Sequence, residues 1–453
     1  MGGLFGTDGV RGVANEVLTP ELALRLGRAA GHVLGGSGHG VIVGRDTRRS
    51  GRMLESALAA GLCSVGMEVW LAGVIPTAGL AFLSRLPEFV AGAVISASHN
   101  PALDNGIKFF DGEGLKLPDE VEQEIERAMT LRPGPAGPEG PGGWGDSLPR
   151  PTEAGIGRVG DRRDLVDVYV GRLLSHAPSL AGLRIVLDCA NGSTYRVAPK
   201  VFRAAGADAT VLFAEPDGTN INAACGSTDP RALQRAVVEH GAGIGVAFDG
   251  DGDRVVAVDE TGALVDGDAL IGILALELRR RGELSGGVVV GTLTTNGGLE
   301  ATLARAGVRL VRTPVGDKHV WDGIARSGAA LGGETSGHVI IRSLSTTGDG
   351  ILTALRLLAV MRERGAALSE LAREVEVWPQ VLRNVRAPRR AEWERIAPFA
   401  QKVRALEGNP DVRTVVRPSG TEPVLRILVE ARTQTVAAST ADELARAAEE
   451  YLR

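Results

Sequence analysis

One local pattern recurs three times along this 453-residue chain and constrains its fold more than any single motif does. In each copy a short apolar strand leads into a polar, glycine-rich turn, and a helix, a glycine and a second strand follow. The first strand and turn of the copies span residues 41–51, 184–193 and 288–298, and the second strands span 68–71, 210–213 and 309–311. This order is typical of a βαβ half-unit. The repetition predicts an α/β fold with three related domains and mixed sheets.

The end of the chain follows another pattern. After about residue 370 we expect a helix near 392–406, strands near 412–416 and 424–429, and a closing amphipathic helix near 438–452. This order predicts a small C-terminal α+β domain.

A segment dense in proline and glycine, residues 132–145, separates the first copy from the second. Such a segment forms neither a helix nor a central strand, so it marks a boundary or a long loop. We therefore expect four domains, over residues 1–155, 156–257, 258–371 and 372–453.

The composition gives no reason to expect a nucleic acid or a membrane as partner. Fifty Lys and Arg stand against 55 Asp and Glu, and no apolar run reaches the ~18 residues that a membrane span needs. Three scattered cysteines, Cys63, Cys189 and Cys225, favour a reducing compartment. Because the N-terminus also lacks the apolar core of a signal peptide, we expect a cytoplasmic protein.

The apolar run at 90–95 predicts a buried strand, and the segment Ser96-Ala97-Ser98-His99-Asn100-Pro101 follows it. The residue before a proline is kept out of the helical region, so the chain turns at Asn100. Ser98 is therefore expected at the tip of a loop beyond the carboxyl end of a strand, where α/β sheets place their ligands.

Three aspartates, Asp249, Asp251 and Asp253, alternate with glycines and precede Arg254. Carboxylates at this spacing can converge on one hard cation, and without a cation they repel one another, which counts against a plain acidic turn. An EF-hand is an alternative because Glu260 falls at its twelfth position, but Arg254 at the sixth position and strand-like flanks argue against it. Mg²⁺ fits the cluster best, with Arg254 beside it to bind a phosphate oxygen.

Residues 332–338 form a glycine-framed loop that holds Glu334, Ser336 and His338. These donors and acceptors suit a polyol or an amine, although a lone histidine in a turn is usually satisfied locally. The loop is therefore a candidate sugar-binding site.

Residues 417–423 lie between two strands of the last domain. Arg417, the hydroxyls and backbone N–H groups of Ser419-Gly420-Thr421, and a second arginine at Arg426 would make a nest for a phosphate. A tight hairpin is the plainer alternative. One loop of chemical interest thus falls in each expected domain, which predicts one active site around a central cleft where the four domains meet.

The chain resembles the α-D-phosphohexomutase superfamily over essentially its whole length. The motifs that carry the resemblance are FGTDGVRG at Phe5, ISASHNPALDNGIKFF at Ile95, AFDGDGDR at Ala247, GGETSGH at Gly332 and RPSGTEP at Arg417. The forms of the first, second and last motifs are similar to those of the amino-sugar branch. The resemblance implies interconversion of glucosamine 6-phosphate and glucosamine 1-phosphate, on the route to UDP-N-acetylglucosamine.

The resemblance also implies roles for individual residues. Ser98 would be a phosphoserine that exchanges its phosphoryl group with the sugar through a 1,6-bisphosphate, and Ser96 is a weaker alternative acceptor. Ser98 and the three aspartates would hold Mg²⁺, and glucosamine 1,6-bisphosphate or glucose 1,6-bisphosphate would be the activator. Arg11 and Arg254 would hold the transferring phosphoryl group, and Lys108, or else His319 or His338, would transfer protons, with Lys108 favoured. Glu334 and Ser336 would bind the sugar. The distal phosphate would be bound by Arg417, Ser419, Gly420, Thr421 and Arg426.

One position departs from the branch, since Thr335 stands where glutamine is usual. Selectivity for the amino sugar is therefore less secure than the reaction type, and a phosphoglucomutase/phosphomannomutase is the nearest alternative. A non-catalytic sugar-phosphate binder and a metal-dependent phosphatase are alternatives from other classes. The expected partner is a small sugar phosphate, and whether the protein forms a homodimer stays open.

Overall fold

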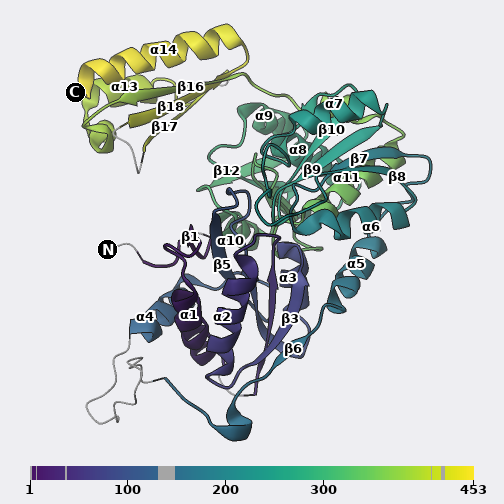
Figure 1. The fold of residues 1–453 in the computed structure, drawn as a ribbon. Coiled ribbons are helices and arrows are strands. Elements are labelled where there is room, and N and C mark those ends of the chain that lie inside the picture. The colour runs from purple at the N-terminus through teal and green to yellow at the C-terminus, as the bar shows by residue number, and fades with distance from the viewer. Residues whose placement is uncertain are drawn as a thin grey trace.

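The protein is described by a computed structural model over residues 3–6, 8–35, 38–130, 148–409, 411–419 and 424–452. These residues form four sheets with helices packed against them (Figure 1). The segment 132–145 lies outside the described residues, and what we predict for it is untested.

The first sheet has six strands in the order β1-β5-β4-β2-β3-β6. They are β1 (Val10–Val13), β2 (Gly40–Arg45), β3 (Glu68–Val74), β4 (Phe89–Ile95), β5 (Asp104–Asp111) and β6 (Val159–Asp161), and the helices here are α1 (Pro20–Val33), α2 (Gly51–Cys63), α3 (Thr77–Leu83) and α4 (Asp119–Thr130). β4 is parallel to β2 and antiparallel to β5. The chain therefore reverses between β4 and β5, directly after the buried strand predicted at 90–95, and this reversal holds Ser98.

The second sheet runs β11-β10-β9-β7-β8, and the third runs β13-β12-β14-β15. The strands of the second sheet are β7 (Arg184–Asp188), β8 (Asp208–Leu212), β9 (Ile244–Phe248), β10 (Val255–Asp259) and β11 (Leu264–Val265). The helices of this part of the chain are α5 (Leu165–Ser175), α6 (Val197–Ala204) and α7 (Arg231–Glu239). The strands of the third sheet are β12 (Val288–Thr292), β13 (Arg309–Thr313), β14 (Leu331–Gly333) and β15 (Val339–Ile341). The helices here are α8 (Gly267–Arg280), α9 (Gly297–Arg305), α10 (Asp317–Ser327), α11 (Gly350–Arg364) and α12 (Leu368–Ala372).

The three predicted βαβ units are confirmed. β2 pairs in parallel with β3, β7 with β8, and β12 with β13, and one helix connects each pair (α2, α6 and α9). The exact domain boundaries stay predictions. Strand β6, just after the boundary predicted at residue 155, pairs with β3 and so belongs to the first sheet. Strands β10 and β11, at the boundary predicted at residue 257, belong to the second sheet.

The fourth sheet is antiparallel, in the order β16-β18-β17, with β16 (Gln380–Arg386), β17 (Val412–Pro418) and β18 (Val424–Ala431). Helix α14 (Gln434–Tyr451) follows it. The helix expected near 392–406 is confirmed in part: α13 (Ala397–Arg404) lies within this range, and a separate 3₁₀ helix at Arg390–Arg395 ends before it begins. Pro398 in the first turn of α13 explains the break, because a proline starts a helix well but cannot continue one.

The cores of the molecule are unevenly shared. One continuous cluster of buried apolar side chains joins the second and third sheets, while the first and the fourth sheets have clusters of their own. The fourth sheet and α14 accordingly stand apart from the rest of the molecule in Figure 1. Within the described residues, no helix is long and apolar enough to cross a membrane.

Candidate active site

Ser98 lies buried in the reversal between β4 and β5, with 1 % of its surface exposed. Its backbone is left-handed, with φ of 51°, which is rare for a residue with a side chain. Its Oγ donates a hydrogen bond to Asp249 Oδ2 at 2.5 Å. The hydroxyl that the sequence singles out therefore meets the aspartate loop of the second sheet directly.

The aspartate loop connects the antiparallel strands β9 and β10, which excludes the helix-flanked EF-hand. Ligand oxygens of Asp249, Asp251 and Asp253 lie within 4.8 Å of one another, and all three residues are buried. Burial, and then the carboxylates of Asp253 and Asp251, raise the pKa of Asp249 well above its ordinary value. The loop therefore concentrates negative charge that a cation would relieve.

Two oxygens in this cluster have no hydrogen-bond partner among the described residues. Asp251 Oδ1 and Asp253 Oδ1 are both buried and accept no hydrogen bond there. A buried carboxylate oxygen without a partner is costly, and a hard cation that takes oxygen ligands removes that cost. The donor set thus fits a divalent metal held by the three aspartates.

Cations surround the cluster. Arg11 Nε and Nη2 and Arg254 Nε are buried and donate no hydrogen bond within the described part of the chain, although Arg11 lies 3.1 Å from Asp8 Oδ2. Arg254 Nε lies 3.9 Å from Asp253 Oδ1. Unsatisfied N–H donors beside an acidic cluster suit a bound phosphoryl group, whose oxygens would accept from the arginines.

Lys108 lies on β5 and is fully part of this cluster. Its Nζ is 3.0 Å from Asp251 Oδ2 and 3.9 Å from Asp253 Oδ2, and it is 2 % exposed. Burial alone would lower its pKa, but Asp251, Asp253 and Asp8 raise it above its ordinary value. These ion pairs favour the charged form of Lys108 within the cluster. Its role in proton transfer stays a prediction.

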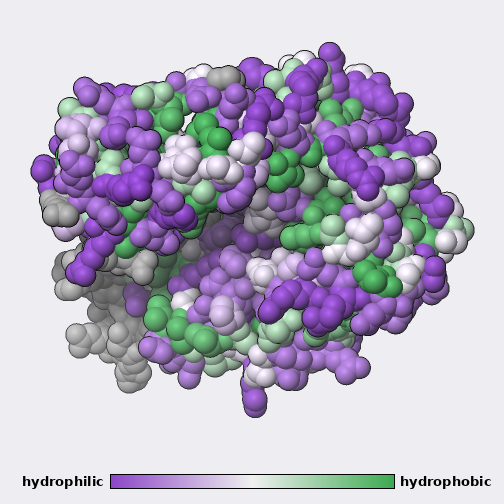
Figure 2. Space-filling view, turned by 90° about the horizontal axis from the view of Figure 1, so that it is seen from above, coloured by the Kyte–Doolittle hydropathy of each residue, from purple (hydrophilic) through white to green (hydrophobic). Residues whose placement is uncertain are grey.

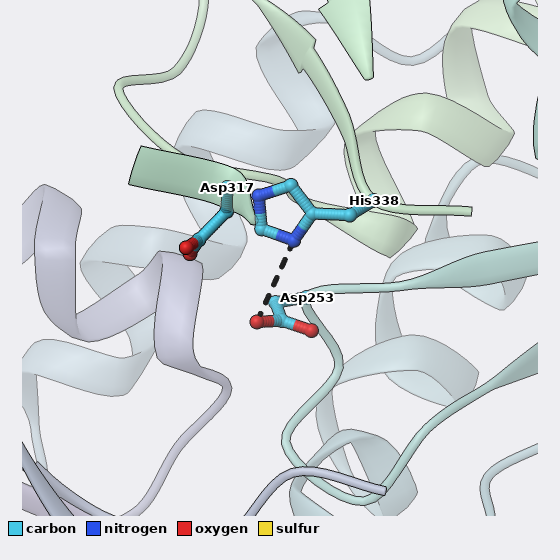
Figure 3. Close-up of side chains that lie close together, drawn as sticks. All are labelled: Asp253, Asp317 and His338. Carbon is cyan, nitrogen blue, oxygen red and sulfur yellow. Dashed lines mark ion pairs between the residues drawn. The ribbon is translucent and has the colours of Figure 1, made fainter. Parts of the chain in front are cut away.

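His338 contacts the cluster through Asp253. Its Nδ1 is 3.6 Å from Asp253 Oδ2, and its Nε2 accepts a 2.9 Å hydrogen bond from the Gly348 backbone N–H. Figure 3 shows the imidazole directed at Asp253, with Asp317 of α10 nearby. Nearby carboxylates raise the pKa of His338 against burial, yet a second proton on Nε2 would face the Gly348 N–H. The backbone contact thus favours the neutral ring, with its proton on Nδ1.

The glycine-framed loop lies between the antiparallel strands β14 and β15. Glu334 is buried and accepts a hydrogen bond from the Gly316 N–H at 2.9 Å, while Ser336 is exposed. His319, near the start of α10, is half-buried. Thr335 donates to Asp268 Oδ2 at 2.9 Å, so its hydroxyl is directed at the first turn of α8.

The last loop connects β17 and β18, as expected. Arg417 is directly opposite Arg426 in the register of these strands, and Asn384 of β16 is the next residue in the same row. Two like charges opposite each other destabilise a sheet unless an anion lies between them. Ser419 is buried beside them, and Gly420 and Thr421 lie outside the described residues. Sequence reasoning missed Asn384, because only strand pairing brings it here.

Lys116 is a second residue that the sequence did not reveal. Its Nζ lies 2.6 Å from Asp8 Oδ1 and 2.5 Å from Asp317 Oδ2, so it joins the N-terminal loop to α10. This ion-pair network therefore links loops of the first domain to a helix of the third. From above, the surface is hollowed near its centre, and hydrophilic residues line the hollow (Figure 2).

Four domains of the phosphoglucomutase/phosphomannomutase family match the chain in order. They are alpha/beta/alpha domain I over residues 2–132, domain II over 167–262, domain III over 266–377 and the C-terminal domain over 382–447. The chain belongs to this family, and it is an isomerase of the phosphomutase type.

Full-length relatives narrow the class. Phosphoglucosamine mutase of Desulforudis audaxviator is 50% identical over 463 residues, covering 100% of this chain and 99% of the relative. Phosphoglucosamine mutase of Moorella thermoacetica is 51% identical over 437 residues, covering 95% of each chain. These relatives favour the amino-sugar mutase over the hexose mutase.

Solved structures share the fold. A phosphoglucomutase/phosphomannomutase family protein from Burkholderia thailandensis has a TM-score of 0.81 at 25% identity, over 99% of this chain and 97% of that one. An Aspergillus fumigatus N-acetylphosphoglucosamine mutase, solved in complex with GlcNAc-6P and magnesium, has a TM-score of 0.67 at 18% identity, over 99% and 96% of the chains.

Proposed function

We propose that this protein interconverts glucosamine 6-phosphate and glucosamine 1-phosphate by means of a phosphoryl group carried on Ser98. The observation that carries the proposal is the contact between Ser98 Oγ and Asp249. Beside it lie buried carboxylate oxygens and arginine N–H groups that have no hydrogen-bond partner within the described residues. A serine hydroxyl surrounded in this way can carry a phosphoryl group whose charge the neighbours compensate.

The reaction would proceed in two transfers. A sugar hydroxyl attacks the phosphorus of phospho-Ser98, the P–Oγ bond breaks, and a sugar 1,6-bisphosphate forms. After the bisphosphate turns over in the cleft, Ser98 Oγ attacks the other phosphate and releases the isomer. Each transfer forms one P–O bond and breaks one. In the first, the sugar hydroxyl loses its proton and the serine oxygen gains one; in the second, the serine hydroxyl loses its proton and the sugar oxygen gains one, so no co-reactant is consumed.

Mg²⁺ is the metal we assign to Asp249, Asp251 and Asp253, with the Ser98 phosphate beside them. When bound, it would neutralise charge on the transferring phosphoryl group. Arg11, Arg254 and Lys108 would hold the phosphoryl oxygens as cations. Because phosphoryl transfer has a loose transition state, positioning and charge compensation matter more than a strong base.

The distal phosphate would bind the row of Arg417 and Arg426 on the fourth sheet, with Ser419 and, outside the described residues, Gly420 and Thr421. Glu334, Ser336 and His319 would face the sugar. His338 would act by orienting Asp253 through its Nδ1–H. One distal nest can serve both orientations of the sugar, since either phosphate can occupy it while the other reacts.

The proposal also covers the activator, the cellular compartment and the oligomeric state. A sugar 1,6-bisphosphate would charge Ser98 in the first turnover, the protein would work in the cytoplasm, and a homodimer is compatible with the chemistry because every proposed group comes from one chain.

The test is the ratio of kcat/KM for glucosamine 6-phosphate to that for glucose 6-phosphate, with Mg²⁺ and a trace of the matching bisphosphate. We expect a ratio of at least about 10, because a C2 ammonium can make a charge-assisted hydrogen bond to Glu334 that the C2 hydroxyl of glucose cannot match. Thr335→Gln, measured beside the parent, shows whether position 335 sets the ratio. A ratio near one contradicts the amino-sugar assignment, and release of inorganic phosphate without isomerisation contradicts the mutase.

A further inference from the structure

The turn between β2 and α2, residues 46–50, contains a charged pair that the reaction described above does not use. Arg48 is among the largest fully buried side chains of the described residues, with 1 % of its surface exposed, and Asp46 is equally buried. Arg48 Nε donates to Asp46 Oδ2 at 2.9 Å. A buried ion pair is costly to desolvate, so stability alone is a weak reason for this pair to lie beside the serine loop.

The other two nitrogens of the Arg48 guanidinium donate hydrogen bonds to the loop that holds Ser98. Nη2 donates to the carbonyl oxygens of Ser98 at 2.9 Å and Asn100 at 2.8 Å. Nη1 donates to the carbonyl oxygen of Asp104 at 3.0 Å and also to that of Pro101. One planar group thus holds four carbonyls, three in the segment that connects β4 to β5 and one on the first residue of β5.

Asp46 holds the other side of the same residue through a serine. Asp46 Oδ2 accepts a 2.6 Å hydrogen bond from Ser96 Oγ, and Ser96 Oγ accepts a 2.9 Å hydrogen bond from the Ser98 backbone N–H. The N–H and the C=O of Ser98 are therefore both bound, directly or through Ser96, to the Asp46–Arg48 pair. Ser96 is fully buried and already engaged at its oxygen, so it is poorly placed to accept a phosphoryl group.

We propose that Asp46 and Arg48, with Ser96 as a relay, are positioning residues that fix Ser98 Oγ against the aspartate loop during both phosphoryl transfers. The inference rests on the proposed function. A left-handed serine persists only where its surroundings over-determine it, and the pair supplies that constraint from both backbone groups. Lysine cannot replace Arg48, because one ammonium cannot span four carbonyls in a plane.

Misplacing a reacting group by about 1 Å can cost ~100-fold in rate. We therefore expect Arg48→Lys to lower kcat by about 10- to 100-fold while KM for glucosamine 6-phosphate changes little. Ser96→Ala removes only the relay and should lower kcat by a smaller factor, about 10-fold. Both variants should carry phosphate on Ser98 alone.

The experiment measures the single-turnover rate at which a sugar 1,6-bisphosphate phosphorylates Ser98, by intact-protein mass spectrometry, together with kcat, KM and the midpoint of thermal unfolding. Arg45→Lys is the matched control, because Arg45 ends β2, pairs with Glu55 at 3.3 Å, and contacts Asp46 at the backbone carbonyl and not at the carboxylate that pairs with Arg48. A merely structural role would lower the unfolding midpoint of Arg48→Lys and leave the phosphorylation rate of the folded fraction unchanged.

The outcomes separate the two proposals. If the parent protein takes no phosphate on Ser98, the proposed function itself fails. If the parent is phosphorylated and Arg48→Lys and Ser96→Ala are phosphorylated as fast as Arg45→Lys, the positioning role is overturned. If Arg48→Lys does not fold, Ser96→Ala decides alone: a slower single turnover at unchanged KM supports the role, and a parental rate overturns it.

Discussion

The serine loop and the fourth sheet are attached to the molecule in opposite ways. Arg48 and the Asp46–Ser96 relay bind the serine loop from its own domain, and Asn222 Nδ2 adds a 2.9 Å hydrogen bond to the Ser98 carbonyl from the second. The fourth sheet has its own apolar core and meets the third domain through polar contacts such as those of Asn296 with Trp378 and of Gly297 with Glu430.

The difference assigns different tasks to the two regions. A buried, multiply bonded loop would keep the proposed phosphoryl carrier in place, whereas a domain held by polar contacts can shift without exposing a shared apolar core. In the proposed mechanism the reacting groups would thus lie on the first two domains, and the distal phosphate would bind the domain that has an apolar core of its own. This division suits an enzyme that must present two different phosphates to one serine.

The largest expected effect comes from breaking the fixed side. Asp251→Asn removes a carboxylate that faces the metal site and pairs with Lys108 at 3.0 Å. We expect Mg²⁺ affinity to weaken by more than about 100-fold, with a matching loss of activity at limiting Mg²⁺. Titration of activity with Mg²⁺ after chelation measures it, and Asp229→Asn, at an exposed ion pair with Arg231, is the control. Parental Mg²⁺ dependence in Asp251→Asn would contradict the assigned metal site.

A smaller effect is expected on the distal grip. Arg426→Ala removes a cation that faces Arg417 across β17 and β18. A charge-assisted hydrogen bond contributes about 1.5–3 kcal/mol, so KM for glucosamine 6-phosphate should rise roughly 10- to 100-fold. The rate at which a saturating bisphosphate phosphorylates Ser98 should change less. Arg404→Ala on the exposed face of α13 is the control, and an equal effect of both variants on KM would refute the nest.

The smallest expected effect is on the pH dependence of stability, through Asp268 of α8, which accepts a hydrogen bond from the Asn296 N–H. Burial, first of all, raises the pKa of Asp268 from 3.8 to about 7, although the Asn296 N–H and the Thr335 hydroxyl oppose the shift. The folded protein therefore binds this proton more tightly than the unfolded chain, and the free energy of unfolding falls as pH rises from about 4 to about 7.

Asp268→Asn removes that dependence. The variant should gain stability relative to the parent, on the order of 2 kcal/mol at pH 8, and gain nothing near pH 4. Unfolding midpoints at the two pH values measure the gain. Equal differences at both values would show that Asp268 does not titrate in this window.

Local signals predicted much of this molecule. The three βαβ units and the strands around the aspartate loop follow from apolar runs and glycine-rich turns, which depend on neighbours in the sequence. The break before α13 was also readable, since Pro398 stands inside the expected helix. Residues brought together by register or by packing between domains were not: Asn384 beside Arg426, Lys116 between Asp8 and Asp317, and the Gly348 N–H on His338. Arg48 lay in a noted turn, but its four carbonyl partners belong to another strand connection.

The central claim is that Ser98 carries the phosphoryl group which the sugar receives. The direct measurement is to label phospho-Ser98 with radioactive phosphate, mix the enzyme with excess unlabelled glucosamine 6-phosphate and Mg²⁺, and follow the label through one turnover. We predict that the label leaves the protein and appears in the sugar bisphosphate and then in the sugar monophosphate, and that Ser98→Ala takes up no label. Label that stays on the protein while isomerisation continues would contradict the account.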